Sequence, residues 1–142
     1  MSSALNRSPE KAAAAEVADN ALAKHCFQWF VRERASINER HVELCRVPAP
    51  TFLEAKRAEW MLAQLKSFGY DAKLDRGGTV VAPFDPGWRG PHVALTAHLD
   101  TVLAPRLPED IKVDVDGTVR GPGVSDNGAG LAALLAIAQV LR

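Results

Sequence analysis

The sequence predicts an α/β domain of three layers, in which helices cover a mixed sheet on both faces. Three observations predict this class. Helical patterns fill the first half of the chain and strand-like patterns with turn signals follow. The last element is a helical run, Leu131 to Leu141, that is apolar except at Gln139. A helix that is apolar on every side must be covered on more than one face, and a layered domain provides that cover.

The composition is typical of a soluble globular domain. Of the 142 residues 47% are hydrophobic and 24% are charged, and 17 basic residues balance 17 acidic ones. This balance argues against nucleic acid or an anionic membrane as a partner. The N-terminus lacks the apolar stretch of a secretory signal, and the longest apolar run, Ala129 to Val140, is too short to span a bilayer. We therefore expect a cytoplasmic protein.

The first part of the chain is expected to be helical. Ser8-Pro9-Glu10 is a good helix start, and the helix formers that follow predict a helix over Ala12 to Arg34. A second helical piece is expected over Asn38 to Arg46. His25 and His41 lie among charged residues on these helices and are interpreted as solvated surface histidines.

A further helix is predicted after a proline-containing break. Val47-Pro-Ala-Pro-Thr51 cannot be the interior of a helix, because its prolines remove backbone donors. Thr51 is expected to cap the next helix, and Glu54, three residues later, would complete a capping box. That helix is expected to run to about Phe68, where Gly69 ends it.

The pattern then changes from helical to strand-like. The first pattern predicts a hairpin or two short strands and the last predicts a hairpin, and between them lies a short apolar strand suited to the centre of a sheet. The expected strands are Tyr70 to Leu74 with Thr79 to Ala82, then His92 to Thr96, then Ile111 to Val115 with Thr118 to Arg120 around an Asp-Gly turn.

Other residue groups that could carry chemistry are interpreted as structural. Cys26 and Cys45 lack a second ligand type at metal spacing, so we expect two reduced and partly buried thiols. The Glu109-Asp110 pair follows a proline in a loop and is interpreted as a solvated surface pair.

Three residues form the candidate site. In a strand, residues two apart point to the same face, so His98 and Asp100 can meet. Asp126 stands in a glycine-rich turn that enters the last helix, where backbone amides favour an ionised carboxylate. Each element alone has a simpler explanation, a histidine at a strand end with a loop-capping Asp, or an N-cap. Occurring together in this order, they suggest one half of a metal site.

The segment Ala94 to Leu141 resembles the metal-binding half of the di-zinc metallopeptidases that include peptidase T, aminoacylase, glutamate carboxypeptidase and succinyl-diaminopimelate desuccinylase. The resemblance extends upstream to about Arg46. It implies a zinc exopeptidase-like fold, two Zn²⁺ ions per complete site (with Co²⁺ or Mn²⁺ as alternatives), and hydrolysis of a small peptide or an N-acyl amino acid. It further implies that His98 is a terminal metal ligand, that Asp100 serves catalysis by orienting this imidazole, that Asp126 bridges both metals, and that the Asp126–Asn127 peptide is cis.

The sequence also departs from that family. Ala97 replaces the usual Gly, and Ser125-Asp-Asn-Gly-Ala-Gly is closer to peptidase T-like members and to the sibling zinc aminopeptidases. The family's catalytic Glu-Glu pair, its remaining ligands and its dimerisation domain have no counterpart here. We therefore expect residues 1–142 to be the N-terminal part of a catalytic domain (1–46 a helical lead-in, 47–142 family-like), cut within its last helix and inactive alone. A sibling aminopeptidase and a non-catalytic module that keeps only the fold are the alternatives.

Overall fold

The computed structural model describes residues 9–142, which divide into two compact units between Arg34 and Ala35. The first unit contains α1 (Pro9–Asp19) and α2 (Ala21–Arg32). The helix predicted over Ala12 to Arg34 is therefore interrupted. The cause is Asn20, whose side-chain oxygen accepts hydrogen bonds from the backbone amides of the next turn and so starts a new helix. The predicted start is confirmed at Pro9, whereas Ser8 lies outside the described residues.

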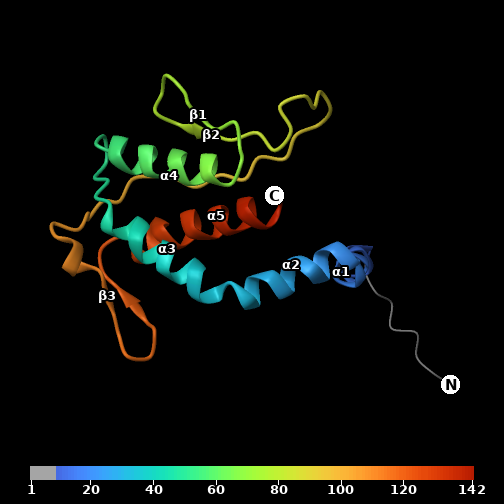
Figure 1. Cartoon of the computed structure of the whole chain (residues 1–142), viewed down its shortest axis with the longest axis horizontal. Helices are drawn as coiled ribbons and strands as arrows, with labels where there is room; N and C mark the ends of the chain where they lie inside the picture. Colours follow the sequence, from blue (N-terminus) through green and yellow to red (C-terminus); the bar gives the residue numbers. More distant parts are fainter. Residues whose placement is uncertain (1–8) are drawn as a thin grey trace. The chain divides into compact units, whose positions relative to one another are not determined.

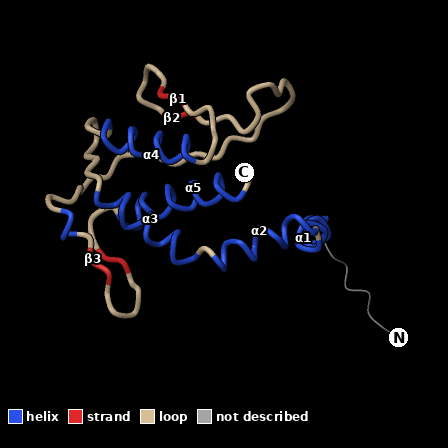
Figure 2. The backbone as a smooth tube through the Cα atoms, viewed as in Figure 1, coloured by secondary structure: helices blue, strands red, loops and turns tan. Residues whose placement is uncertain are grey.

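The second unit holds the remaining helices and all the strands of the described part of the chain (Figures 1 and 2). The helix predicted over Asn38 to Arg46 begins earlier, directly after α2. In chain order the elements are α3 (Arg34–Arg46), α4 (Ala55–Ser67), β1 (Lys73–Leu74), β2 (Val80–Val81), the short 3-10 turn η1 (Pro108–Asp110), β3 (Lys112–Val113), β4 (Val119–Arg120), the distorted helical turn η2 (Val124–Ala129) and α5 (Gly130–Val140).

The core of this unit lies where α3, α4 and α5 meet, with α4 and α5 running side by side in Figure 1. Burial of these apolar side chains is the main force that holds the three helices together. The hydroxyl of Tyr70 adds a polar tie, because it donates to the Ala138 carbonyl of α5 at 2.7 Å. The buried members of the cluster are Leu44, Met61, Leu65, Tyr70, Ala72, Leu131 and Leu135.

Both predicted hairpins are confirmed, although their strands are shorter than expected. Each forms its own antiparallel two-stranded sheet, β1 with β2 and β3 with β4. The central strand predicted over His92 to Thr96 is wrong for the described residues, which place no strand beside it. Val93 and Leu95 are consequently 91% and 58% exposed. A strand needs neighbouring strands to accept its backbone hydrogen bonds, and an apolar run cannot supply them itself.

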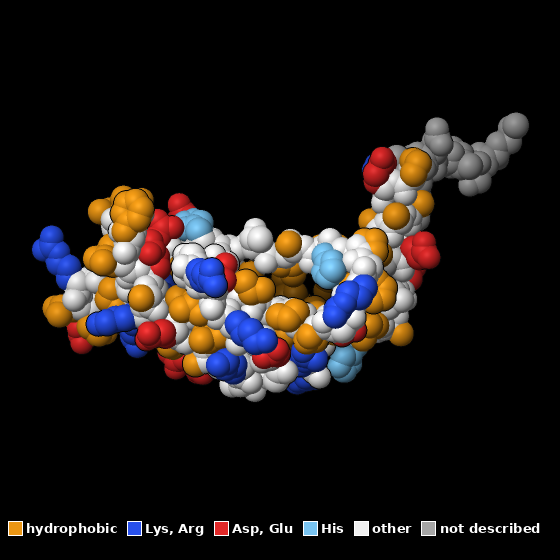
Figure 3. Space-filling view, turned by 90° about the horizontal axis from the view of Figure 1, so that it is seen from above, with side chains coloured by type: hydrophobic (Ala, Val, Ile, Leu, Met, Phe, Trp, Pro, Cys, Tyr) orange, Lys and Arg blue, Asp and Glu red, His pale blue; other side chains and the backbone are white. Residues whose placement is uncertain are grey.

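Helices with small sheets are compatible with the predicted α/β class, whereas the three-layer arrangement stays a prediction. Large apolar side chains remain exposed among charged ones, as the space-filling view of one face shows (Figure 3). Within residues 9–142, no helix combines the length and the apolarity needed to cross a membrane.

The start of α4 corrects the predicted capping box. Thr51 does not cap this helix, because the N-cap position is Glu54 and no side chain caps it. The Glu54 carboxylate instead accepts a hydrogen bond from the Phe52 amide at 2.6 Å. The hydroxyl of Thr51 donates to the ionisable carboxylate of Asp100, a stronger acceptor than a neutral group. The predicted end is confirmed, since Gly69 follows the helix with φ +88°.

Candidate metal centre

Asp126 reaches the site on the turn η2, which leads directly into α5. This turn is distorted, with non-helical angles at Asp126 and Asn127 and a cis peptide bond between them, as the family resemblance implied. Helix α3 contacts this turn through His41. There the His41 ring donates from Nε2 to the carbonyl of Val124 at 2.9 Å. The interpretation of His41 as a solvated histidine is therefore wrong, because α3 packs against the turn and partly buries the ring.

His98 and Asp100 reach the site on an extended segment rather than on a paired strand. The alternation of a strand is nevertheless kept, because Ala97 and Leu99 pack against the core cluster. His98 and Asp100 therefore face the opposite side, toward Asp126. The predicted meeting of these two side chains thus occurs without the predicted sheet.

The extended segment is fixed by contacts to α4 and to the residues before it. Arg57, only 1% exposed, donates from Nη1 to the Leu99 carbonyl at 2.8 Å and from Nε and Nη2 to the Val47 carbonyl at 3.0 and 2.6 Å. Two residues after Leu99, the Thr101 amide donates to the Ala49 carbonyl at 2.8 Å. The buried guanidinium of Arg57 and one backbone hydrogen bond thus hold this segment in place, as hydrogen bonds from neighbouring strands would in a sheet.

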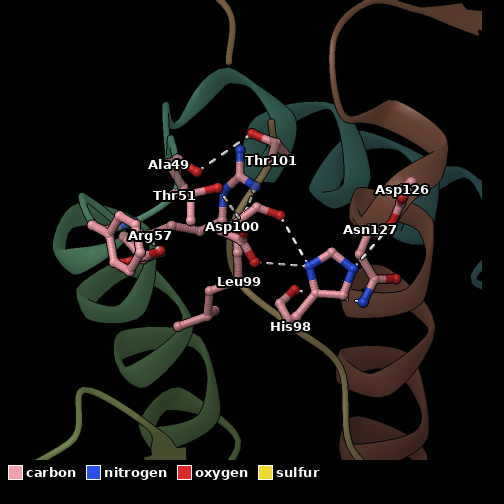
Figure 4. A network of polar contacts seen from close by, with 11 residues as sticks. Ala49, Thr51, Arg57, His98, Leu99, Asp100, Thr101, Asp126 and Asn127 are labelled. Atoms are coloured by element: carbon pink, nitrogen blue, oxygen red, sulfur yellow. Dashed lines mark hydrogen bonds and ion pairs between the residues drawn. The ribbon is translucent and has the colours of Figure 1, made fainter. Parts of the chain in front are cut away.

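The imidazole of His98 lies between two carboxylates, as Figure 4 shows. On one side Nδ1 is 3.1 Å from Asp100 Oδ1 and 3.0 Å from the Asp100 carbonyl oxygen. On the other side Nε2 is 2.9 Å from Asp126 Oδ1. Asp100 is anchored in turn, because its second carboxylate oxygen accepts from the Thr51 hydroxyl at 2.7 Å. The site is therefore a chain of four side chains joined by short polar contacts.

These contacts alter the protonation of the site. The hydrogen bond from Thr51, followed by that with His98, holds the pKa of Asp100 below its usual value. For His98, partial desolvation acts to lower the pKa, but the hydrogen bonds with Asp126 and Asp100 outweigh it and raise the pKa. Behind the site, burial raises the pKa of the Cys45 thiol to about 11, although the charge of Arg57 opposes this shift.

The donor chemistry suits a zinc-type ion, but the number of donors is small. Imidazole nitrogen and carboxylate oxygen are ordinary zinc ligands, and an imidazole on a metal commonly donates its other N–H to a carboxylate, as His98 does to Asp100. His98 Nε2 and Asp126 Oδ1 converge on one place, 2.9 Å apart. Within residues 9–142, however, no three His, Cys, Asp or Glu side chains form a cluster able to hold a metal. Catalytic zinc usually has three protein ligands.

An apolar hollow of about 610 Å³ adjoins the pair His98 and Asp100. Side chains of α4 and α5 line its floor, including Met61 and Leu134, and the β1–β2 turn lines one side. The candidate centre is therefore open to molecules or chain segments that present an apolar group.

The structure brings together the three predicted site residues, His98, Asp100 and Asp126. It also adds residues that the sequence interpretation missed, namely Thr51, Arg57 and His41. One signal could have identified Arg57. It precedes Met61 by four residues and Leu65 by eight, so it lies on the apolar stripe of α4, where an arginine needs buried partners.

Comparison with known proteins agrees with a metal-dependent hydrolase. The model of Peptidase family M28 matches residues 79–142, which include His98, Asp100 and Asp126 but not Thr51. A protein of Pyrobaculum aerophilum named as a [LysW]-lysine/[LysW]-ornithine hydrolase is 37% identical over 99 residues. That match covers 70% of this chain, and the chain spans 27% of the length of that relative. The two matches support the wider superfamily of zinc-type metallopeptidases, and a hydrolase as the class of protein, but not the narrower group of peptidase T and aminoacylase.

Proposed function

We propose that the protein is a zinc-dependent hydrolase of peptide or N-acyl amide bonds, and that residues 98–126 supply part of its two-metal centre. The single observation that carries this proposal is the position of the His98 ring, with Nδ1 on Asp100 and Nε2 facing Asp126 at 2.9 Å. Two metal-binding donor types aimed at one place, with the second ring nitrogen fixed by a carboxylate, are characteristic of zinc sites.

Each residue has a separate role in this proposal. His98 would hold one metal through Nε2, and Asp126, whose side chain is 89% exposed, has a free second oxygen with which it could hold another. Asp100 keeps the Nδ1 proton in place and so directs Nε2 outward. When bound, the metals would polarise the substrate carbonyl and lower the pKa of water. The proton relay would need a carboxylate other than Asp100 and Asp126, and a Glu-Glu pair of the kind found in the resembled family does not occur in this sequence.

We further propose that residues 1–142 form the N-terminal part of the catalytic domain and have no activity alone. The chain spans 27% of its relative, and its centre has two metal donors, fewer than a catalytic zinc requires. The apolar side chains of Val93 and Leu95 are exposed, and further residues of a complete domain would cover them. A homodimer through a domain outside these residues belongs to the same proposal.

Zinc titration by calorimetry tests the proposed centre. The chain is compared with Asp126→Ala, which removes the second donor, and with Asp116→Ala as a matched control on the exposed β3–β4 turn. If the two donors suffice to bind zinc, the parent chain and Asp116→Ala bind it equally, and Asp126→Ala binds it at least about tenfold more weakly. Equal zinc affinity in all three chains would reject the assignment of Asp126.

An activity assay separates the alternatives for the whole protein. Dipeptides, N-acyl amino acids and conjugates of lysine or ornithine are the substrates to compare, since the relative is named for [LysW]-lysine and [LysW]-ornithine. Release of free N-terminal amino acids from peptides would favour a sibling aminopeptidase. A protein that binds no metal and cleaves none of these substrates would be a non-catalytic module. Turnover by residues 1–142 that His98→Ala abolishes would overturn the proposed inactivity of the chain.

A further inference from the structure

Thr51 touches the candidate centre although it lies 49 residues before Asp100 in the chain. Its hydroxyl donates to Asp100 Oδ2 at 2.7 Å, while the other carboxylate oxygen, Oδ1, contacts His98 Nδ1 at 3.1 Å. Both oxygens of Asp100 thus have a partner, His98 on the same extended segment and Thr51 on a distant one. A carboxylate held at both oxygens cannot rotate about its χ2 axis without breaking one of the two bonds.

The backbone that carries Thr51 is itself fixed to the extended segment. Two residues before it, the Ala49 carbonyl accepts from the Thr101 amide at 2.8 Å. Arg57 joins the same two stretches, because it donates to the carbonyls of both Val47 and Leu99. Thr51 therefore approaches Asp100 from a segment with at least two independent attachments, so its position does not depend on its own hydrogen bond.

The ring of His98 needs such support because packing does not provide it. Its side chain is 52% exposed, so its orientation depends on the polar contacts of Nδ1 and Nε2. We infer that Thr51 is a positioning residue of the candidate metal centre, which fixes the Asp100 carboxylate and, through it, the direction of His98 Nε2. This inference rests on the proposed function where it assigns Nε2 to a metal, whereas the hydrogen-bonded chain itself is independent of it.

A purely structural role is the alternative, in which the Thr51 hydroxyl merely ties two segments together. The chain offers a matched control for this role. Thr101 joins the same two segments, but its hydroxyl donates to the Ala49 carbonyl at 3.4 Å rather than to the side chain of Asp100 or His98. Replacement of either threonine by valine removes one hydroxyl at nearly constant volume. Only a positioning role predicts that the two replacements affect the His98 ring differently.

The test is NMR of the ¹⁵N-histidine-labelled 142-residue chain without metal. The exchange rate of the Nδ1 proton with water is measured, and the signal is assigned by its loss in His98→Gln. We expect Thr51→Val to exchange about fivefold faster, as befits the loss of one hydrogen bond, and Thr51→Ser and Thr101→Val to stay near the parent rate. Thr51→Ala serves as a second variant, and circular dichroism confirms the fold of each. An unchanged rate in Thr51→Val and Thr51→Ala would overturn the positioning role.

Cobalt titration of the same variants then separates this inference from the proposed function. If both hold, Thr51→Val weakens cobalt binding by about tenfold and Thr51→Ser does not. If the parent chain binds no cobalt while its Nδ1 proton responds to Thr51→Val, the positioning of His98 stands and the metal assignment fails. If cobalt binds and neither readout responds to Thr51→Val, the metal assignment stands and the positioning role fails.

Discussion

His98 and Asp126 reach the same place on two arms of opposite construction. The helical arm, residues 124–140, consists of η2 and α5. Helix α5 forms its backbone hydrogen bonds between its own turns, while the carbonyl of Val124 in η2 accepts one from His41. The extended arm, residues 97–101, has no strand beside it in the described part of the chain and depends on Ala49, Thr51 and Arg57. A self-contained element is stabilised by burial, whereas an extended segment is stabilised by polar contacts from elsewhere. Loss of a buried apolar side chain should therefore destabilise the helical arm most, and loss of a hydrogen-bond donor should destabilise the extended arm most.

The largest effect is expected on the helical arm from Leu135→Ala. This side chain is 0% exposed at the contact of α5 with α4, so its truncation leaves a cavity and should lower the free energy of unfolding by about 3 to 5 kcal/mol. Urea denaturation measures the change. Leu141→Ala, at a residue 46% exposed, is the control and should cost less than about 1 kcal/mol. Similar losses in both variants would show that α5 is not buried as described.

Arg57→Met removes hydrogen bonds that hold the extended arm. The variant keeps an apolar side chain in the core but leaves the Val47 and Leu99 carbonyls without their donor, at a cost of about 2 to 3 kcal/mol. Its effect should also be local, with faster hydrogen exchange at the Thr101 amide, while amides of α5 change only with global stability. The exposed Arg46 provides the control, Arg46→Met. Unchanged Thr101 exchange in Arg57→Met would contradict this account.

The pH dependence of the free energy of unfolding tests the burial of Cys45, a residue of α3 beside η2. Cys45 has a pKa of about 11 in the folded chain against an ordinary value of 9.0. Between pH 9 and 11 the unfolded chain loses this thiol proton and the folded chain retains it. Stability should therefore fall as pH rises through this window, by up to about 1.4 kcal/mol per pH unit. Urea denaturation of the parent chain and of Cys45→Ala gives the test, and equal slopes in both would refute it.

The smallest effect is expected from His41→Ala. Its ring donates one hydrogen bond to the Val124 carbonyl, so the loss should be about 1 kcal/mol. Because the bond supports η2, the amide of Gly128, which donates to Gly123 within that turn, should exchange faster. His25→Ala, on the exposed surface of α2, should leave that amide unchanged. If both variants have the same exchange rate at Gly128, η2 does not depend on α3.

The contrast between the arms also explains how much of the fold the sequence could predict. The helices and the two hairpins depend on local signals, such as the apolar stripe of α4 and the Asp116-Gly117 turn, and these predictions are confirmed. The strand over His92 to Thr96 could not be predicted in the same way, because its apolar residues do not specify a neighbour. Asn20 divided a predicted helix because its side chain competes with the backbone for hydrogen bonds, a signal that helix propensity alone overlooks.

The candidate site follows the same division. The proximity of His98 and Asp100 follows from the two-residue period of an extended chain, so it was predictable without a structure. The role of Thr51 was not. A threonine followed three residues later by a glutamate is a good capping box, and only the tertiary structure brings Asp100 close enough to take its hydroxyl. The metal-ligand roles of His98 and Asp126 remain predictions that the zinc titration tests.

Gly128 in η2 and Gly123, directly before η2, limit how this sequence can change over evolutionary time. A Cβ atom at Gly128 would stand 2.5 Å from the Cys45 sulfur, and one at Gly123, which has φ +71°, would overlap the Thr101 side chain. The close packing of this turn against Cys45 and Thr101 therefore requires that neither glycine carry a side chain. Substitution at these two positions should be rare. At Gly128 a Cβ atom would also stand 2.7 Å from the Gly123 carbonyl oxygen, and a smaller residue at position 45 would not relieve that backbone clash.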